Sequence, residues 1–241
     1  MIRYIENHDE RRAASRVFEK ASPGDTGLGS FEAGLVAATS LFFSTKAPVL
    51  LYAGQELGEQ AEGATGYSGD DGRSSIFDYI SPPTLRALHT AGYDVTKLDA
   101  TMRSRVSRYI SLGALIHSPE LERGEVFELN ERNRTNPAFG DHGRSAYACA
   151  RALTERSGRL VLLVSNFSTE RRFEARVYLS DAALASLGIA HDHDTRNVLT
   201  RTLISSTGPQ DVSLYAGALR DAGIPVSLGP LDFAVFSVEV S

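Results

Sequence analysis

The chain has 241 residues, of which 42% are hydrophobic and 23% charged, and its formal net charge is −5. This balance excludes wholesale disorder, and the mild acidity argues against a nucleic-acid partner, which needs a basic face. The single cysteine, Cys149, excludes an intramolecular disulfide and a cysteine-based metal site.

No apolar run approaches the roughly 18 residues of a membrane-spanning helix, so no membrane partner is expected. Residues 1–4 lack the basic-then-apolar order of a signal peptide. A cytoplasmic location is therefore the default expectation, although the location stays unknown because the chain looks truncated at its N-terminus.

Two short apolar segments flank a predicted helix in the first part of the chain. Residues 1–5 are β-prone and end in a polar cluster at 6–10, as a barrel strand does when it presents a site at its C-terminal end. Helical spacing predicts a helix over 31–44. The continuous apolar run 48–53 predicts a parallel strand buried on both faces. The order strand, helix, strand indicates one βαβ unit.

The chain changes its pattern near residue 120. Before this point, residues 58–80 form a long Gly-rich loop of the kind that is often functional, and 98–117 predict an amphipathic helix. Beyond it, period-two alternation predicts short strands and a β-sandwich. The predicted strands lie at 125–129, 145–153, 159–166, 174–179, 198–204, 212–215 and 225–241. We therefore expect two domains, 1–120 and 121–241.

The motif Asn7-His8-Asp9 carries the strongest chemical signal, because it sets an imidazole beside a carboxylate at a strand end. Carboxylates flank the sugar ring in glycoside hydrolysis, where positive charge develops, and an imidazole can hold sugar hydroxyls. On the residues alone, a polar strand end with satisfied hydrogen bonds is the commoner interpretation.

Several motifs together resemble the α-amylase superfamily, glycoside hydrolase family 13. Residues 3–9, Arg-Tyr-Ile-Glu-Asn-His-Asp, resemble its last conserved block, where the seventh barrel strand ends in Asn-His-Asp. Residues 48–56, ending in Gly-Gln-Glu, resemble its eighth strand, and 69–79 resemble the loop that follows in one bacterial group. Residues 160–167 are similar to the core strand of its all-β C-terminal domain. The motifs agree in order and spacing over most of the chain.

The resemblance implies an α/β plus all-β fold: the last strands and helices of a (β/α)8 barrel, followed by an antiparallel β-sandwich. It implies that Asp9 stabilises the oxocarbenium-like transition state and that His8 binds the same sugar. Asn7 belongs to the substrate-binding group and is expected to orient the loop, with Glu10 and Arg11, which follow the block, supporting it. Tyr67, in the Gly-rich loop, is a candidate for stacking on a sugar. No metal and no cofactor is expected.

One departure from the family is large. Its earlier blocks, which carry the aspartate nucleophile and the glutamate acid/base, precede Asn-His-Asp, but here only six residues precede Asn7. We therefore expect a C-terminal fragment of a retaining hydrolase or transglycosylase that is inactive alone. Its expected partners are an α-glucan or maltooligosaccharide and the missing N-terminal barrel segment, and self-association is possible in the absence of that segment.

A second hypothesis is a non-catalytic carbohydrate-binding or structural module, such as a degenerate paralogue. Its discriminating feature would be an aromatic platform on the β domain. The chain has no tryptophan, and the phenylalanines and tyrosines beyond residue 120 fall mostly within strand patterns, which disfavours such a platform. The run His191-Asp192-His193-Asp194 has metal-ligand residue types, but a solvated turn is the commoner interpretation of such a loop.

Overall fold

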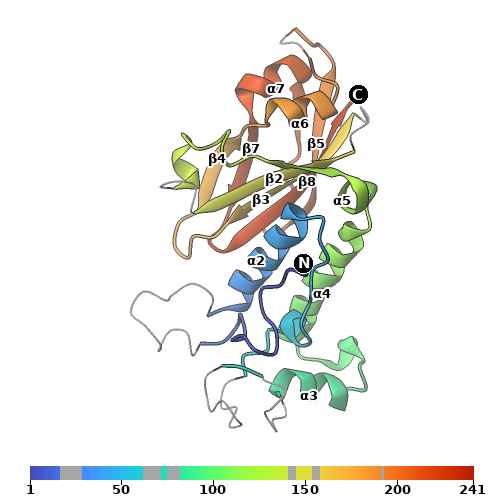
Figure 1. Cartoon of the computed structure of the whole chain (residues 1–241), viewed down its shortest axis with the longest axis vertical. Helices are drawn as coiled ribbons and strands as arrows, with labels where there is room; N and C mark the ends of the chain where they lie inside the picture. The colour runs from blue at the N-terminus through green and yellow to red at the C-terminus, as the bar shows by residue number, and fades with distance from the viewer. Residues whose placement is uncertain (17–28, 62–71, 75–81, 141–144, 154–157, 191–192) are drawn as a thin grey trace. The chain divides into compact units, whose positions relative to one another are not determined.

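The computed structural model describes residues 1–16, 29–61, 72–74, 82–140, 145–153, 158–190 and 193–241. The chain divides into two compact units, the first comprising Met1–Leu41 and Ala47–Gly113, the second Phe42–Lys46 and Ala114–Ser241. The first unit is mainly helical and the second is built on antiparallel sheets, so the predicted combination of an α/β part with an all-β part is confirmed (Figure 1).

The helices of the first part begin and end close to where periodicity predicts. Helix α2 spans Phe31–Ser44, and the Ser30 hydroxyl caps its start by accepting a hydrogen bond from the Ala33 N–H at 3.1 Å. Helix α4 spans Ala100–Ile116 and is capped in the same way by Asp99. The shorter helices are α3 (Pro83–Thr90) and the 3₁₀ turns η1 (Gln55–Leu57) and η2 (Val95–Lys97). Among the described residues, no helix is long and apolar enough to cross a membrane.

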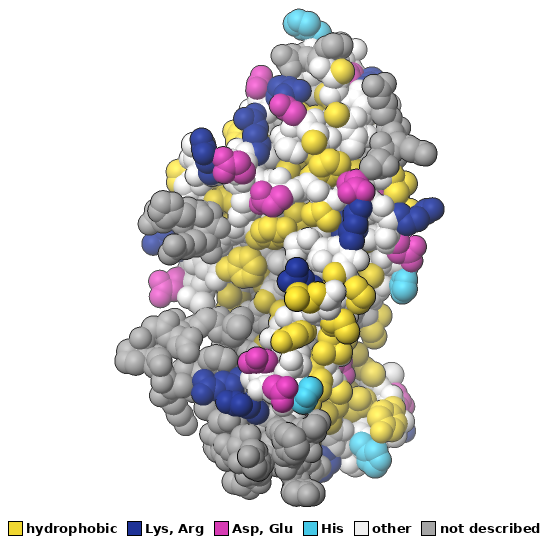
Figure 2. Space-filling view, viewed as in Figure 1, with side chains coloured by type: hydrophobic (Ala, Val, Ile, Leu, Met, Phe, Trp, Pro, Cys, Tyr) yellow, Lys and Arg dark blue, Asp and Glu magenta, His cyan; other side chains and the backbone are white. Residues whose placement is uncertain are grey.

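The two apolar segments at 1–5 and 48–53 lie parallel, but they meet in a single bridge between Arg3 and Val49. The prediction that 48–53 is buried on both faces was wrong, since Leu50 and Leu51 are 40% and 42% exposed. A parallel strand is buried on both faces only where other strands and helices cover it, and one bridge provides no such cover. Figure 2 shows apolar side chains gathered where Figure 1 marks the N-terminus.

The second unit contains a six-stranded antiparallel sheet in the order β1-β2-β3-β8-β5-β6 and a two-stranded antiparallel sheet of β4 and β7. The strands are β1 (Glu125–Glu128), β2 (Ala146–Ala152), β3 (Arg159–Asn166), β4 (Phe173–Val177), β5 (Asn197–Ser205), β6 (Val212–Tyr215), β7 (Ile224–Leu228) and β8 (Asp232–Val240). The helices are α5 (Pro119–Arg123), the 3₁₀ turn η3 (Pro137–Phe139), α6 (Asp181–Ser186) and α7 (Ala216–Ala222).

Both sheets contribute to one hydrophobic core. Leu162 and Phe236 enter it from the six-stranded sheet, and Phe173 and Val226 enter it from the two-stranded sheet. The predicted antiparallel sheet structure of this part of the chain is thereby confirmed. The predicted single strand 225–241 is instead two strands that belong to different sheets, because the chain turns between them at Leu231, which has a φ of 47°.

A buried arginine on β2 fixes two neighbouring segments of this unit. The guanidinium of Arg151, 1% exposed, donates hydrogen bonds to the main-chain carbonyls of Phe43 (3.2 Å), Thr45 (3.0 Å), Leu121 (2.6 Å) and Gly124 (3.1 Å). The last carbonyls of a helix have no partner within the helix and carry partial negative charge. One cation therefore binds the carbonyls of the segments 43–45 and 121–124 and ties both segments to β2.

We predict that Arg151→Met lowers the free energy of unfolding by at least about 3 kcal/mol, because it leaves several buried carbonyls without their charged donor. The matched control is Arg201→Met at an exposed position on β5, where the change should stay below about 0.5 kcal/mol. Urea denaturation followed by circular dichroism measures both, and equal stabilities for the two variants would contradict the role given to Arg151.

Candidate functional site

The residues that follow the two bridged segments lie together. The Arg3 N–H donates to the Pro48 carbonyl at 2.9 Å, and the Leu50 N–H donates to the Arg3 carbonyl at 2.8 Å, so both segments run in the same direction. Glu6 follows the first segment and Glu56 the second, and the charge of Glu56 is close enough to act on Glu6. The polar cluster at 6–10 and the Gly54-Gln55-Glu56 turn therefore share one side of the first unit.

A buried ion pair holds the loop 6–13. The Glu6 and Arg12 side chains are each 1% exposed, and Arg12 Nη1 lies 2.8 Å from Glu6 Oε1. The second carboxylate oxygen accepts a hydrogen bond from the Ala13 N–H at 2.6 Å. Burial raises the pKa of Glu6, while the Ala13 N–H and the Arg12 guanidinium act in the opposite direction. The two ends of the loop are thus joined through one carboxylate.

Arg12 also connects this loop to two other segments. Its Nε donates to the Ser74 hydroxyl at 2.7 Å, and its guanidinium carbon lies 4.2 Å from the ring centroid of Tyr52. The Tyr52 hydroxyl in turn donates to the Ser74 carbonyl at 3.0 Å. The Arg12 guanidinium therefore joins three segments through hydrogen bonds and ring stacking: the loop 6–13, the second apolar segment and the stretch 72–74.

Asn7 shapes the turn that carries the predicted catalytic residue. Its side-chain oxygen accepts hydrogen bonds from the N–H groups of Asp9 (2.8 Å) and Glu10 (3.0 Å), which is an Asx turn. His8 Nε2 lies 3.2 Å from Asp9 Oδ2, and these side chains are 44% and 67% exposed. The loop thus brings an imidazole and a carboxylate together and keeps both accessible.

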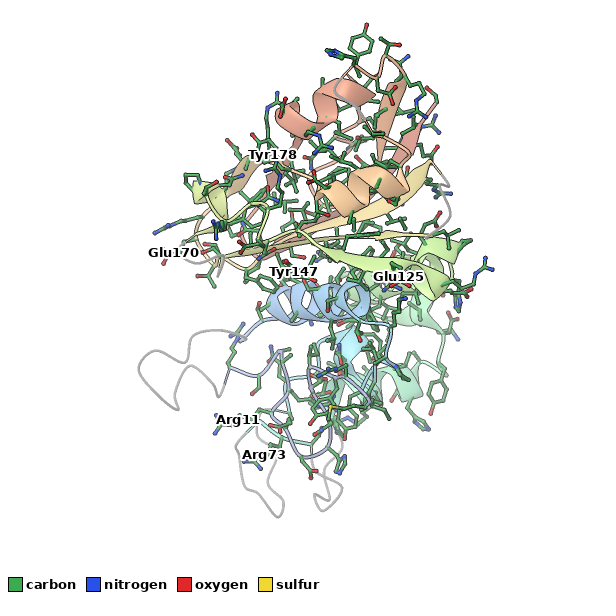
Figure 3. All side chains as sticks on the ribbon, turned by 45° about the horizontal axis from the view of Figure 1, so that its top comes forward. Arg11, Arg73, Glu125, Tyr147, Glu170 and Tyr178 are labelled. Atoms are coloured by element: carbon green, nitrogen blue, oxygen red, sulfur yellow. The ribbon has the colours of Figure 1, made fainter. Side chains whose placement is uncertain are left out.

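Asp9 faces an open hollow of 610 Å³ whose lining includes Tyr4, Ile5, Glu10, Arg11 and Arg73. The Arg11 and Arg73 backbones pair in an antiparallel bridge, and Figure 3 shows the two side chains near one another. Arg73 Nη1 donates to the Asp9 carbonyl at 3.4 Å. A carboxylate here can stabilise a positive charge that develops opposite it, and the imidazole can exchange hydrogen bonds with hydroxyl groups.

The supporting residues differ from those that sequence reasoning named. Glu10 and Arg11 were expected to support the motif, and the buried ion pair that holds the loop is formed by Glu6 and Arg12. Both residues lie in a loop, where neither helix nor strand periodicity applies, so no periodic pattern could have indicated the pair. Tyr67 lies outside the described residues.

The Gly54-Gln55-Glu56 turn makes hydrogen bonds within its own unit. The Gln55 side chain donates from Nε2 to the Tyr109 hydroxyl at 3.0 Å, and Glu56 accepts from the Gly54 N–H at 3.1 Å. Burial raises the pKa of Tyr109, so its hydroxyl stays neutral and available for this contact.

No group of three or more histidine, cysteine, aspartate or glutamate side chains in the described part of the chain could hold a metal ion. Of the run at 191–194, residues 191 and 192 lie outside the described residues. The Asp194 carboxylate binds Arg196 through both oxygens, at 3.0 Å to Nε and 2.5 Å to Nη2.

The fold is similar to that of isomaltulose synthases. The enzyme from Klebsiella sp. LX3 aligns at a TM-score of 0.52 and 16% identity, and the enzyme from Erwinia rhapontici NX5 at 0.51 and 15%. Each alignment covers 99% of this chain and 43% of the other, so the chain spans less than half the length of these proteins. No family model and no curated protein matches the sequence.

The chain shares its fold with part of these isomaltulose synthases, which are enzymes of glycoside hydrolase family 13. The resemblance carried by its motifs is thereby confirmed at the level of the fold. At these identities the likeness extends to the fold alone, and the activity of the family-13 enzymes is not transferred with it.

We predict that Glu6→Ala speeds hydrogen exchange at the Ala13 and Asp9 amides. The substitution removes the carboxylate that accepts the Ala13 hydrogen bond, and it leaves Arg12 buried without its counter-ion. Breaking a buried pair costs about 3–5 kcal/mol, enough to release the loop locally. Glu10→Ala, an exposed change in the same loop, is the control and should leave the Ala13 amide protected. Mass-spectrometric exchange on both variants checks this, and unchanged protection in Glu6→Ala would refute the tether.

Proposed function

We propose that the chain forms part of an α-glucan-acting glycoside hydrolase or transglycosylase in which Asp9 is the transition-state stabiliser and His8 binds the same sugar. The observation that carries the proposal is the accessible His8–Asp9 pair, 3.2 Å apart, at the edge of a hollow and on a loop anchored by buried charges. The family-13 fold supports it, and so does the parallel bridge between Arg3 and Val49, which joins the segment before Asn-His-Asp to the second apolar segment.

In this proposal Asp9 acts through its charge. Positive charge develops on the sugar ring as the glycosidic bond breaks, and a fixed carboxylate opposite the ring lowers the energy of that state. A substrate that displaces water from the hollow strengthens the interaction by lowering the local dielectric constant. His8 contributes a hydrogen bond to a sugar hydroxyl and so fixes the ring over Asp9.

The remaining chemical groups come, in this proposal, from a barrel segment outside these 241 residues. Retaining hydrolysis needs a nucleophile and an acid/base about 5 Å apart. Glu6 cannot serve as either, because it is 1% exposed and engaged by Arg12 and Ala13. The 241 residues by themselves are therefore expected to hydrolyse neither maltooligosaccharides nor an activated aryl α-glucoside.

The same barrel segment is the proposed cover for the apolar residues around the parallel bridge. Ile2, Tyr4, Leu50 and Leu51 are between 40% and 60% exposed. Further strands beside this bridge would bury them and satisfy the neighbouring main-chain groups. Where no such segment is present, the same surface favours self-association, which concentration-dependent light scattering would detect.

The prediction concerns a fusion of this chain to the barrel segment of a family-13 enzyme. In that fusion, we predict that Asp9→Asn lowers kcat for an aryl α-glucoside by at least about a hundredfold. The substitution keeps the shape and removes the charge. His8→Ala should cost about tenfold, the value of roughly one hydrogen bond.

Glu32→Gln is the matched control, because it removes an exposed carboxylate on α2 that does not line the hollow, and it should change kcat by less than about threefold. The joined enzyme without substitutions sets the reference activity. Turnover that is the same in Asp9→Asn and in this reference would contradict the assignment of Asp9.

A further inference from the structure

A second hollow, of 1040 Å³, lies in the β unit and shares no residue with the first. Its lining comes from the end of β6, from α7 and from the segment 193–195. The side chains that bear on its chemistry are His193, Asp194, Thr195, Tyr215 and Asp221. Nothing in the proposed chemistry at Asp9 uses this surface.

Tyr215 is the most prominent apolar group of this hollow. It is the last residue of β6, where exposure alternates so that Val212 and Leu214 are half-buried and Ser213 and Tyr215 face outward. Tyr215 is 65% exposed, although tyrosine rings usually gain stability from burial. Its ring therefore offers an accessible apolar face instead of contributing to the core.

The backbone around this ring is fixed by hydrogen bonds. The Ala216 N–H donates to the Arg196 carbonyl at 2.8 Å, and the Gly217 N–H donates to the Asp194 carbonyl at 2.9 Å. The pairing of Asn197 with Tyr215 continues the sheet up to the edge of the hollow. Because the backbone that carries the Tyr215 ring is already fixed, a ligand that binds there loses little free energy to ordering the protein.

The charges in the lining select the kind of ligand. Asp221 is acidic, Asp194 is already neutralised by Arg196, and neither lysine nor arginine is among the described residues that line the hollow, so this lining offers no charge that attracts an anion. Asp194 already binds Arg196, which leaves the lining short of the ligands that a metal ion needs. A ring face flanked by carboxylate and hydroxyl acceptors suits a neutral molecule that has one apolar face and a rim of hydroxyls, which describes a pyranose sugar.

We propose that Tyr215 is the stacking platform of a second site, on the β unit, that binds neutral oligosaccharides. A sugar ring packs on the exposed face of Tyr215, and its hydroxyls donate hydrogen bonds to Asp221. The site gives the β unit a binding role of its own that does not depend on the chemistry assigned to Asp9. It supplies the aromatic platform that the sequence alone disfavoured, because Tyr215 lies inside a strand pattern yet faces outward.

The test is isothermal titration of the full chain with maltoheptaose. Tyr215→Ala should weaken binding by about five- to tenfold, since an aromatic contact contributes up to about 1.5 kcal/mol and 1.4 kcal/mol corresponds to tenfold. Tyr215→Phe keeps the ring and should bind within about twofold of the unsubstituted chain. Asp221→Asn should show an intermediate loss. Tyr93→Ala is the matched control, because Tyr93 is 70% exposed in the other unit, and it should bind normally.

Three results would overturn the proposal. The first is the absence of saturable heat with maltoheptaose. The second is binding that is lost in His8→Ala and kept in Tyr215→Ala, which would assign the sugar to the loop at Asp9. The third is tighter binding of a sulfated oligosaccharide than of maltoheptaose, which would contradict the neutral class. Failure of the Asp9 assignment in turnover assays leaves the predicted Tyr215 result unchanged, so the two proposals are separately testable.

Discussion

The candidate site depends on the buried ion pair between Glu6 and Arg12. Removing two charges from water is costly, and the pair is tolerated because each partner has further contacts: the Ala13 N–H for the carboxylate, and Ser74 and the Tyr52 ring for the guanidinium. These contacts close the loop on itself. Asp9 can consequently be 67% exposed and still be held in place, which is the condition for a carboxylate that acts by position and charge.

A second buried arginine solves a different problem in the β unit. Arg151 binds four main-chain carbonyls and so neutralises the partial negative charges of those carbonyls. Arg12, in contrast, neutralises the full charge of the Glu6 carboxylate. It secures α5 to the sheet, and the sheet in turn presents β6 and the Tyr215 platform. The two proposed sugar contacts therefore rest on separate supports, each within its own unit, and a failure of one support need not affect the other.

Local patterns predicted regular elements well and contacts poorly. The helix at 31–44 and the strand at 159–166 follow from period and composition, and both form as expected. The apolar run 48–53 has the composition of a buried strand, but composition cannot say whether neighbouring strands cover it, and Leu50 and Leu51 are exposed. Period-two alternation predicted one strand over 225–241, and only the sheet pairing shows that its halves separate into β7 and β8.

The two sites show the same limit. The motif Asn7-His8-Asp9 could be recognised because it is contiguous, whereas its support joins residues 6, 12, 13 and 74 through the fold. The hollow at Tyr215 likewise joins residues near 194 with others near 221. Pattern reasoning assigned Tyr215 to a strand and could not decide which way its ring faced, because burial depends on the sheet to which the strand belongs.

The most direct measurement of the central claim is a crystal structure of the chain joined to a family-13 barrel segment, with a maltooligosaccharide bound. We expect one sugar ring in the hollow beside the loop, with hydroxyls within about 3 Å of His8 and of the Asp9 carboxylate. The Glu6–Arg12 pair should be unchanged in that complex. The account would be contradicted if the sugar bound elsewhere in the joined enzyme and made no contact with His8 or Asp9.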